Sequence, residues 1–554
     1  MRKLAMYILF LFCLNISFGQ DCLDPVSETE QTSNQFRVKH GLSKIWKDDI
    51  DKTAFIYPKK RGVSALRSGT FWVAGTDSEN NLKASHETYM FGITHKRSWF
   101  AGPNDPNTNC EVWDRMFDLS KMNLDVFKAD LADGKIDNPI PLSILGWPGN
   151  GNPHFATIHG FEIPTSNYGY AAFEDVDGDK IYDPEKGDFP INNGADYSSW
   201  SVRNDFFSKA TIPPVGVEIQ LTSNTFNNQG EALDNSIIYE VKLINKSGGR
   251  LTNMGFTIWV FPELGCGEDD FFGCSPDDNL VYIYNRDSLD GWPSGTCGLS
   301  KTTYGYDIPL IGIKVLKPFR GSNDSEVNLS SFIYHNTAFD PPTQTYIPRN
   351  DADEIFNLMS GLWTDGSPLT KGGSGVGGNI PTNYVFSDPP NDEDGWSMCT
   401  AQLAFNFRML MLNFTPFELD HNESNTMTFS VTGVENVPHP CPDITPIIER
   451  TDALEEIWND RILTSTNSIS IDQDQDLTIS PNPTSDIISI SLTGKDKIDK
   501  IELVNLQGQS IKVVSNVGKA SLEMDLSEFI SGAYILIVRT ELGKRFSQKV
   551  IKID

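Results

Sequence analysis

The feature that most constrains this chain is a two-residue alternation of large apolar side chains, which recurs along much of its length. Between residues 237 and 244, for example, Tyr239 and Val241 alternate with Glu240 and Lys242. Successive side chains of a strand point to opposite faces, so this pattern predicts half-buried β-strands. Tracts rich in Glu, Lys, Leu and Ala, which favour helices, are scarce. We therefore expect a mainly β, multi-domain protein with few helices.

Size and charge narrow the class of protein further. The chain has 554 residues, of which 39% are hydrophobic, so it can bury large cores. Its formal net charge of −29 repels phosphate backbones, which argues against nucleic acid as a partner. The same acidity favours cation binding, although solubility alone also accounts for it.

The first 19 residues have the pattern of a signal peptide. Arg2 and Lys3 precede an apolar run over residues 4–14, and the small residues Ser17 and Gly19 follow it. The apolar run is too short to span a membrane comfortably, and no other run approaches the length of a transmembrane helix. We expect export and cleavage after residue 19, with no transmembrane span in the mature chain.

Residues 477–554 form a segment with dense strand signals and no Cys, Trp or His. Alternating apolar positions recur between turn sequences such as Pro481–Pro483 and Ser531–Gly532. About seven short strands at this spacing predict a small, immunoglobulin-like β-sandwich.

The same segment carries a family resemblance. Three motifs occur in order: Ile479–Pro483, then Leu526 with Ser531–Leu536, then Gly543 with Lys549–Lys552. Together they resemble the C-terminal sorting domain of type IX secretion cargo. The resemblance implies recognition by the outer-membrane translocon after passage through the periplasm. It further implies removal of the domain and release or anchoring at the outer cell surface.

The remaining chain divides into three expected regions. We expect an N-terminal β-rich region over 20–205, a β-sandwich over 206–462, and a polar linker over 463–476. Residues 417–431 are predicted to form a β-hairpin, residues 121–131 a helix capped by Ser120, and residues 445–462 an amphipathic helix that closes the body.

The body also resembles an uncharacterised family of large secreted proteins that carry the same tail. The resemblance supports architecture and location, not an activity. The matching residues are Thr70–Gly75, Gly146–Gly149, Phe173–Pro190, Gly273–Cys274, Asn279–Leu280, Tyr284–Asn285 and Leu362–Pro368.

Seven cysteines remain after the signal segment, so at least one stays unpaired within the chain if the others form disulfides in an oxidising compartment. Cys266 and Cys274 are closest in sequence and are candidates to close a short loop. The rest of the connectivity is undecided, and the chain has no CxxC motif of the kind that zinc ribbons use.

Residues 175–188 contain the sharpest chemical motif. Oxygen ligands at alternate positions let a turning loop surround one Ca²⁺, which takes six to eight oxygens. Lys180 and Lys186 stand where the EF-type loop has Gly and Glu, so an acidic surface turn is the alternative. The predicted calcium ligands, with a structural role, are Asp175, Asp177, Asp179, Asp183 and Asp188, together with the carbonyl of Ile181.

Other chemical patterns point less clearly to a site. The acidic residues 268–270 and 277–278 are expected to form a solvated loop, although they could hold a second cation. The tryptophans could stack on sugars but are expected in cores; those considered are Trp72, Trp99, Trp147, Trp200, Trp259, Trp292, Trp363 and Trp396.

Nucleophile-elbow and zincin motifs are absent from the sequence. We therefore expect the body to be a non-enzymatic binding or structural module whose partner is a surface glycan or a protein. The alternative is a secreted hydrolase of polysaccharide or protein, which two close carboxylates in a deep cleft would favour.

Overall fold

The computed structural model describes residues 22–47, 54–87, 98–163, 166–291, 297, 302–336, 342–346, 348, 351–465, 477–492, 497–504, 510–540 and 545–553. The predicted signal peptide, Trp292 and most of the predicted linker lie outside these residues. Within them the protein is mainly β, as the alternation predicts.

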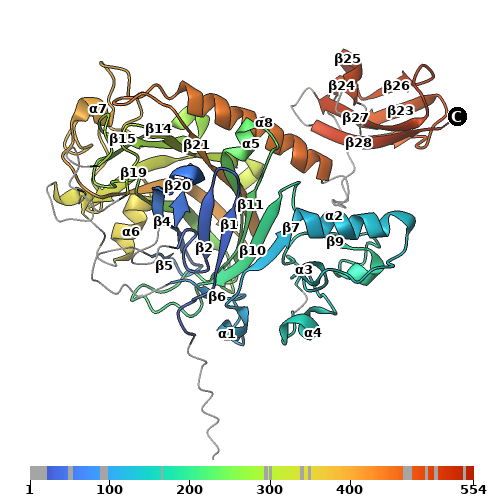
Figure 1. Ribbon diagram of the computed structural model, residues 1–554, viewed down its shortest axis with the longest axis horizontal. Helices are drawn as coiled ribbons and strands as arrows, with labels where there is room; N and C mark the ends of the chain where they lie inside the picture. Colours follow the sequence, from blue (N-terminus) through green and yellow to red (C-terminus); the bar gives the residue numbers. More distant parts are fainter. Residues whose placement is uncertain are drawn as a thin grey trace, which may run out of the picture.

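Two large antiparallel sheets build the body (Figure 1). The first sheet has the order β1 (Glu28–Thr32), β2 (Arg37–Gly41), β3 (Phe55–Ile56), β4 (Ser64–Thr76), β13 (Leu251–Pro262), β20 (Arg408–Leu419) and β19 (Ser331–Asn336), with β5 (Leu82–Ser85) beside β4. The second has the order β14 (Asp270–Ser275), β15 (Leu280–Asn285), β16 (Leu310–Lys317), β21 (Ser424–Val434), β12 (Ser236–Asn245), β11 (Val217–Thr225), β10 (Tyr197–Asn204) and β6 (Phe100–Ala101), with β7 (Phe117–Ser120) beside β10.

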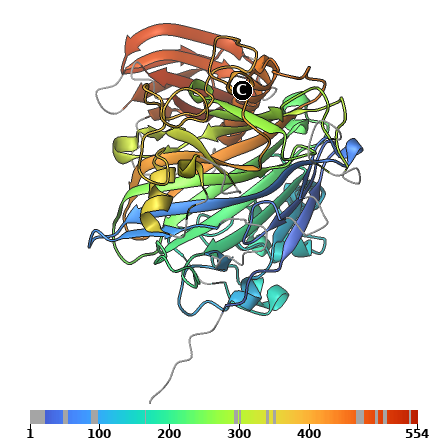
Figure 2. The ribbon, with the colours of Figure 1, turned by 90° about the vertical axis from the view of Figure 1, so that its left-hand side faces the viewer.

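The two sheets face each other across one core, and their long strands lie in stacked layers (Figure 2). Trp46 from the first sheet's side donates its indole N–H to the Tyr239 hydroxyl of β12 at 2.9 Å. Phe71 of β4 contacts Phe429 of β21 edge to face, and Phe429 stacks on Tyr239. These contacts define a β-sandwich with an aromatic centre.

Strands from both halves of the body share these sheets. β1 to β5 extend the sheet that contains β13 and β20, and β10 pairs with β11 along its whole length. The expected boundary at residue 205 therefore falls inside one sandwich.

The predicted hairpin at residues 417–431 is wrong in its pairing. Both strands form, as β20 and β21, but β20 pairs with β13 and β19 while β21 pairs with β12 and β16. The turn between them at residues 420–423 therefore carries the chain from one sheet to the other. Alternation identifies strands locally but does not say which sheet they join.

A compact insert, residues 102–196, covers the outer face of β10. It contains the short helices α1 (Cys110–Trp113), α3 (Leu142–Leu145) and α4 (Phe155–His159), and the longer α2 (Lys121–Asp130). Ser120 caps α2 by accepting the Asn123 amide, as predicted. A separate core joins the insert to Trp200 and Val202 of β10.

The predicted closing helix is α8 (Thr445–Ser465), which crosses the second sheet and runs three residues into the expected linker (Figure 1). Leu454 and Trp458 pack against Phe226 and Leu316 in a small core. Lys314 of β16 lies within ion-pairing distance of Asp452 and Glu455 of the helix. Of the shorter helices, α6 (Ala352–Met359) packs against β4, β5, β13 and β20, α5 (Glu231–Asp234) against α8 and β12, and α7 (Met398–Ala401) against β14.

The tail forms its own sandwich. One sheet has the order β22 (Leu477–Ser480), β23 (Ile487–Leu492) and β26 (Ser521–Asp525). The other has the order β25 (Ser510–Lys519), β24 (Ile498–Val504), β27 (Gly532–Thr540) and β28 (Arg545–Lys552). The predicted alternating residues, among them Ile490, Leu503 and Leu536, form the core between the two sheets.

Three disulfides join Cys22 to Cys110, Cys266 to Cys297 and Cys399 to Cys441. Cys274 is the unpaired cysteine among the described residues, and burial raises the pKa of its thiol well above the usual value. The suggested Cys266–Cys274 pair is therefore wrong. Cys274 lies within β14, whose pairing with β15 holds it in the core.

Candidate functional site

The acidic loop 175–188 lies in the insert, closed at its base by the pairing of β8 (Phe173–Glu174) with β9 (Phe189–Pro190). Tyr182 anchors the loop: its ring is fully buried and its hydroxyl donates to the Ile144 carbonyl at 2.7 Å. Gly149 permits this packing, because a Cβ there would lie 2.4 Å from the Tyr182 Cβ. The loop is thus fixed to the insert core at its middle.

Three of the predicted calcium ligands lie close together. Single carboxylate oxygens of Asp175, Asp177 and Asp188 all lie within 4.8 Å of one another. A Ca²⁺ ion with bonds of about 2.3–2.6 Å can bridge oxygens at that separation. Asp188 is buried, Asp175 half-buried and Asp177 exposed, so the cluster opens to solvent on one side.

Backbone amides hold these carboxylates in place. Asp175 accepts the amides of Gly178 and Lys180, and Asp188 accepts those of Val176 and Asp183, at 2.8–2.9 Å. Lys180 takes a left-handed φ of 65° at the position where an EF-type loop has Gly. The turn that the calcium motif needs is therefore made with lysine in place of glycine.

Asp179 and Asp183 lie outside this cluster. Lys186 Nζ lies 2.7 Å from Asp179 and 3.4 Å from Asp177, and the contact with Lys186 lowers the pKa of Asp179. Asp183 instead caps the short helix Pro184–Lys186 and lies 3.1 Å from His154 Nε2. Ile181 donates its amide to Asp179 Oδ1 at 2.7 Å.

Electrostatics in the cluster favour a positive charge. Burial raises the pKa of Asp188, and the nearby Asp175 and Asp177 raise it further, against the lowering effect of its two amide donors. The hydrogen bond between Lys186 and Asp179 raises the pKa of Lys186 to about 12, so its amine stays protonated. An ammonium group thus already neutralises the exposed side of the loop.

A groove of about 610 Å³ lies beside the insert. Four asparagines with exposed or partly exposed side chains line it, together with the aromatic rings of Trp113, Phe161, Tyr168 and Tyr170. The lining residues are Pro103, Asn104, Asp105, Asn107, Thr108, Asn109, Val112, Trp113, Phe161, Glu162, Ser166, Asn167, Tyr168, Tyr170, Lys246 and Asn422. No local sequence pattern indicates this groove, because its residues come from segments more than 300 positions apart.

Buried polar groups fix the floor of the groove. Asn104 donates its amide to Glu218 at 3.1 Å and its side-chain NH₂ to Asp205 at 3.0 Å. Asp205 also accepts the amides of Gly216 and Val217. Burial raises the pKa of Asp205 and of Glu218, yet both carboxylates serve as acceptors beneath the groove. Their contacts are those of structural supports.

Tyr168 forms one wall of the groove. Lys242 donates to its backbone carbonyl, and Lys246 Nζ lies 4.7 Å from the centroid of its ring. Lys246 also donates to Asn422 Oδ1 at 3.0 Å. Lys242 of β12 thus holds the backbone of Tyr168, and Lys246 from the turn after β12 lies against its ring.

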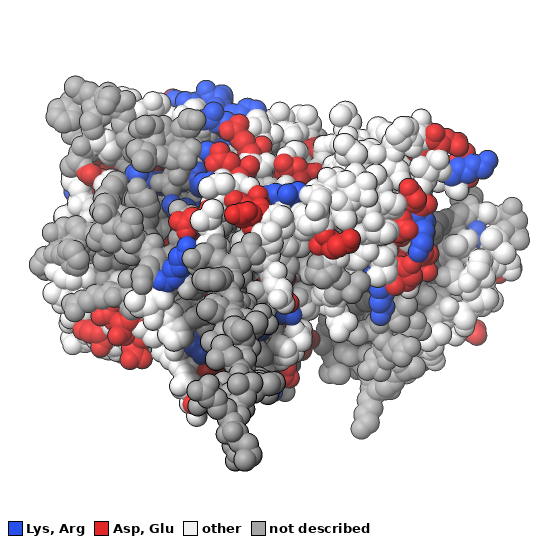
Figure 3. Space-filling model, turned by 90° about the horizontal axis from the view of Figure 1, so that it is seen from below, with Lys and Arg blue, Asp and Glu red and all other residues white. Residues whose placement is uncertain are grey.

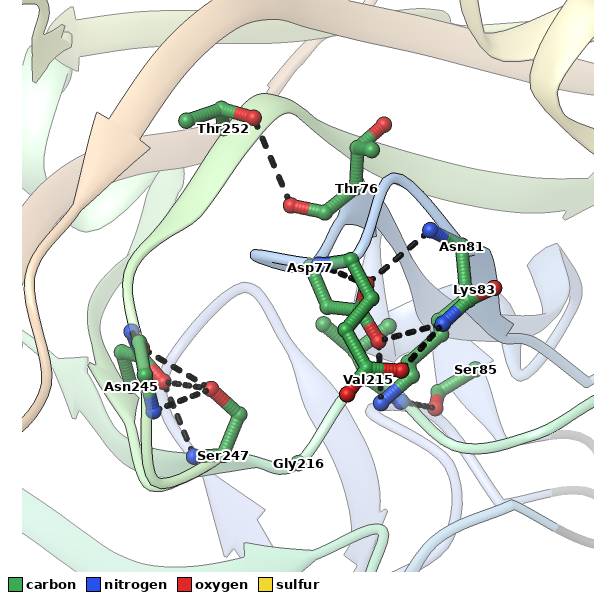
Figure 4. Close-up of polar contacts among 12 residues, drawn as sticks. Thr76, Asp77, Asn81, Lys83, Ser85, Val215, Gly216, Asn245, Ser247 and Thr252 are labelled. Carbon is green, nitrogen blue, oxygen red and sulfur yellow. Dashed lines mark hydrogen bonds and ion pairs between the residues drawn. The ribbon is translucent and has the colours of Figure 1, made fainter.

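Another hollow, of about 830 Å³, lies near the β4–β5 turn. Figure 4 shows Asp77 accepting from Asn81 and pairing with Lys83, while Asn245 bonds Ser247 in the facing turn. The Asn81 amide and then Lys83 lower the pKa of Asp77. These contacts shape the two turns and leave the hollow without a converging set of free groups among those drawn.

The tryptophans considered for sugar stacking are in cores. Trp72, Trp99, Trp147, Trp200, Trp259, Trp363 and Trp396 are all 8% exposed or less. On the face drawn in Figure 3, acidic side chains lie in small groups, several of them beside lysine or arginine. Of the described helices, none has the length and apolar character needed to cross a membrane.

Comparison with known proteins bears on the tail. Residues 478–553 match the family model of the secretion system C-terminal sorting domain. This chain carries a type IX secretion sorting domain. The domain indicates secretion or display at the outer surface and handling by the type IX secretion machinery.

Two further comparisons concern the chain as a whole. No curated protein matches the chain. Among solved structures, a polysaccharide lyase has 9% identity and a TM-score of 0.17, with 72% of this chain and 42% of that one covered. The BSP domain of a biofilm-associated protein has 8% identity and a TM-score of 0.14, with 64% and 60% covered. This chain thus spans less than two thirds of either protein.

Proposed function

We propose that the type IX outer-membrane translocon exports this protein, and that its sandwich body is a non-enzymatic module that binds a surface glycan. The observation that carries the proposal is the groove beside the insert. Side-chain amides suit the hydroxyl groups of sugars, and the face of Tyr168 suits the C–H face of a pyranose ring. The rigid support beneath Asn104 and behind Tyr168 preorganises these groups.

The test is a glycan array probed with the full chain, followed by affinity measurements on any bound glycan. Tyr168→Ala should weaken binding about tenfold, the effect of losing one aromatic contact together with part of its buried area. Tyr306→Ala is the matched control, because Tyr306 is 76% exposed and lies outside the groove.

Equal affinity in Tyr168→Ala and wild type would contradict the groove assignment. A hydrolase panel run on the same preparation separates binding from catalysis. Turnover that one carboxylate substitution abolishes would favour a secreted hydrolase instead.

We also propose that the loop 175–188 binds one structural Ca²⁺ through Asp175, Asp177 and Asp188. Asp179, Ile181 and Asp183 complete the set if Lys186 moves away from Asp177 and Asp179 on binding. The support for this is the spacing of the three clustered oxygens and the backbone amides that hold Asp175 and Asp188 in place. The ion would fix the loop to the insert beside the groove.

Thermal unfolding of the full chain in EDTA and in millimolar CaCl₂ tests the loop. Calcium at 100 times its dissociation constant stabilises by about 2.7 kcal/mol, a shift of several degrees in Tm. Asp177→Asn should lose the part of the Tm shift that comes from calcium in this loop. Asp394→Asn, at an exposed position, should keep it. A shift of the same size in Asp177→Asn and wild type would refute the loop as a calcium site.

A further inference from the structure

A second group of carboxylates lies in the core of the sandwich, where sequence predicted a solvated loop. Asp269, Asp270 and Asp290 are 0%, 3% and 1% exposed. The group lies where the turn after β13 of the first sheet enters β14 of the second, next to the Cys266–Cys297 disulfide. Glu268 and, further along, Asp277 and Asp278 are exposed or partly exposed as expected.

The backbone of this turn is shaped around two of the carboxylates. Asp290 accepts the Cys266 amide at 2.8 Å and the Tyr304 amide at 2.5 Å, and Asp270 accepts the Leu264 amide at 3.0 Å. Gly265 has a φ of 73°, and a Cβ at this position would lie 1.8 Å from Asp290 Oδ2. The chain therefore approaches Asp290 as closely as glycine allows.

Asp269 differs from its neighbours. Neither of its carboxylate oxygens has a hydrogen-bond donor among the described residues, although the side chain is fully buried. One of these oxygens lies within 4.8 Å of an Asp290 oxygen and of Cys266 Sγ. Burial of a carboxylate without a partner costs several kcal/mol, so an arrangement of this kind needs a compensating positive charge or a proton.

The surroundings add negative charge to this position. Burial raises the pKa of Asp269 to about 8, and Asp290, Asp287 and Glu268 contribute to the increase. Among the described residues Asp269 makes no ion pair with lysine, arginine or histidine. A metal cation would relieve both the repulsion and the missing hydrogen bonds.

We propose that Asp269 and Asp290 bind a Ca²⁺ ion in the core, with Asp270 adjoining the site. The donor set is made of carboxylate oxygens, which hard cations prefer. Cys266 Sγ is held in a disulfide, so it is not a thiolate that would select zinc. The ion would join the turn after β13 to the end of β15, and so tie the two sheets together at this edge.

Calcium stoichiometry tests the site. Equilibrium dialysis with ⁴⁵Ca²⁺ would use the full chain after removal of metal with chelator. Asp269→Asn, which preserves shape, should bind one ion fewer than wild type. Asp277→Asn, an exposed neighbour, is the matched control and should bind the wild-type number. Wild-type stoichiometry in Asp269→Asn would overturn the proposal.

The loop 175–188 is tested separately, so the two sites cannot be confused. The variant Asp175→Asn/Asp177→Asn should keep one bound ion, the one held by Asp269. No calcium uptake in the loop variant would overturn the core site without affecting the groove.

Discussion

The buried histidine side chains His335 and His40 bind protons less readily than histidine does in water. His335 of β19 is fully buried on the face of the first sheet that carries Trp72 and Trp259, where its Nε2 accepts the indole N–H of Trp259 at 3.0 Å. Burial lowers the pKa of His335 from 6.5 to about 4. His40, bonded to Gln31 and Ile45, is lowered similarly. Both imidazoles are thus neutral in the folded protein over the range in which they charge in the unfolded chain.

This difference predicts a loss of stability on acidification. Between pH 6.5 and 4 the unfolded chain binds a proton at His335 that the folded chain does not, so the free energy of unfolding falls as pH falls. The slope from one histidine is about 1.4 kcal/mol per pH unit. Urea unfolding of His335→Gln across this range should show a smaller dependence of the free energy of unfolding on pH, by about 1.4 kcal/mol per pH unit. The contribution of His40 to this dependence should remain.

His421→Gln is the matched control, since His421 is exposed in the turn between β20 and β21. An unchanged slope in His335→Gln would show that this residue is not the source of the acid sensitivity. Below pH 4 the contribution of His335 should level off, because both states are then protonated.

At the scale of the element, α8 depends on a few large side chains. Trp458 is fully buried against Phe226, Leu316 and the α5 segment. Trp458→Ala should lower the free energy of unfolding by about 3–5 kcal/mol, the range for truncating a buried aromatic residue. Denaturant unfolding measures this, with the exposed Glu456→Ala on the same helix expected to change little. A change below 1 kcal/mol in Trp458→Ala would mean that the helix is not packed as described.

Local patterns predicted most of the elements. The strand at 237–244, the capped helix α2, the closing helix and the seven tail strands all depend on periodicity and capping within short windows, and all were confirmed. The pairing of β20 and β21 was not predictable in this way. Adjacent strands usually form hairpins, and only the distant partners β13 and β12 decide otherwise.

The candidate sites also divide into those that local sequence predicts and those that depend on distant segments. The spacing of Asp175, Asp177 and Asp188 predicted a cluster that is present in the structure. The prediction was possible because the three residues are close in sequence. Asp269 appeared as one member of an acidic run, and nothing local indicates that it is buried. Its partner Asp290 and the groove residue Lys246 come from distant segments of the chain, so only the tertiary fold reveals either site.

For the molecule as a whole, the sorting domain predicts where the protein accumulates. Deletion of residues 477–554 should leave the body in the periplasm, because the translocon then has no signal to recognise. Fractionation with an antibody against the body would measure this, and the full chain at matched expression is the control. Equal amounts of the truncated and full-length proteins at the outer surface would contradict this role of the tail.

The turn that carries the chain from β20 to β21 has a consequence for the timing of folding. β20 lies between β13 and β19, and β21 lies between β16 and β12, so each sheet lacks an interior strand until residues 408–434 arrive. A ribosome or export channel delivers these residues after about three quarters of the chain. Pairings this distant in sequence form slowly. Both sheets of the body therefore stay incomplete until most of the chain has been delivered.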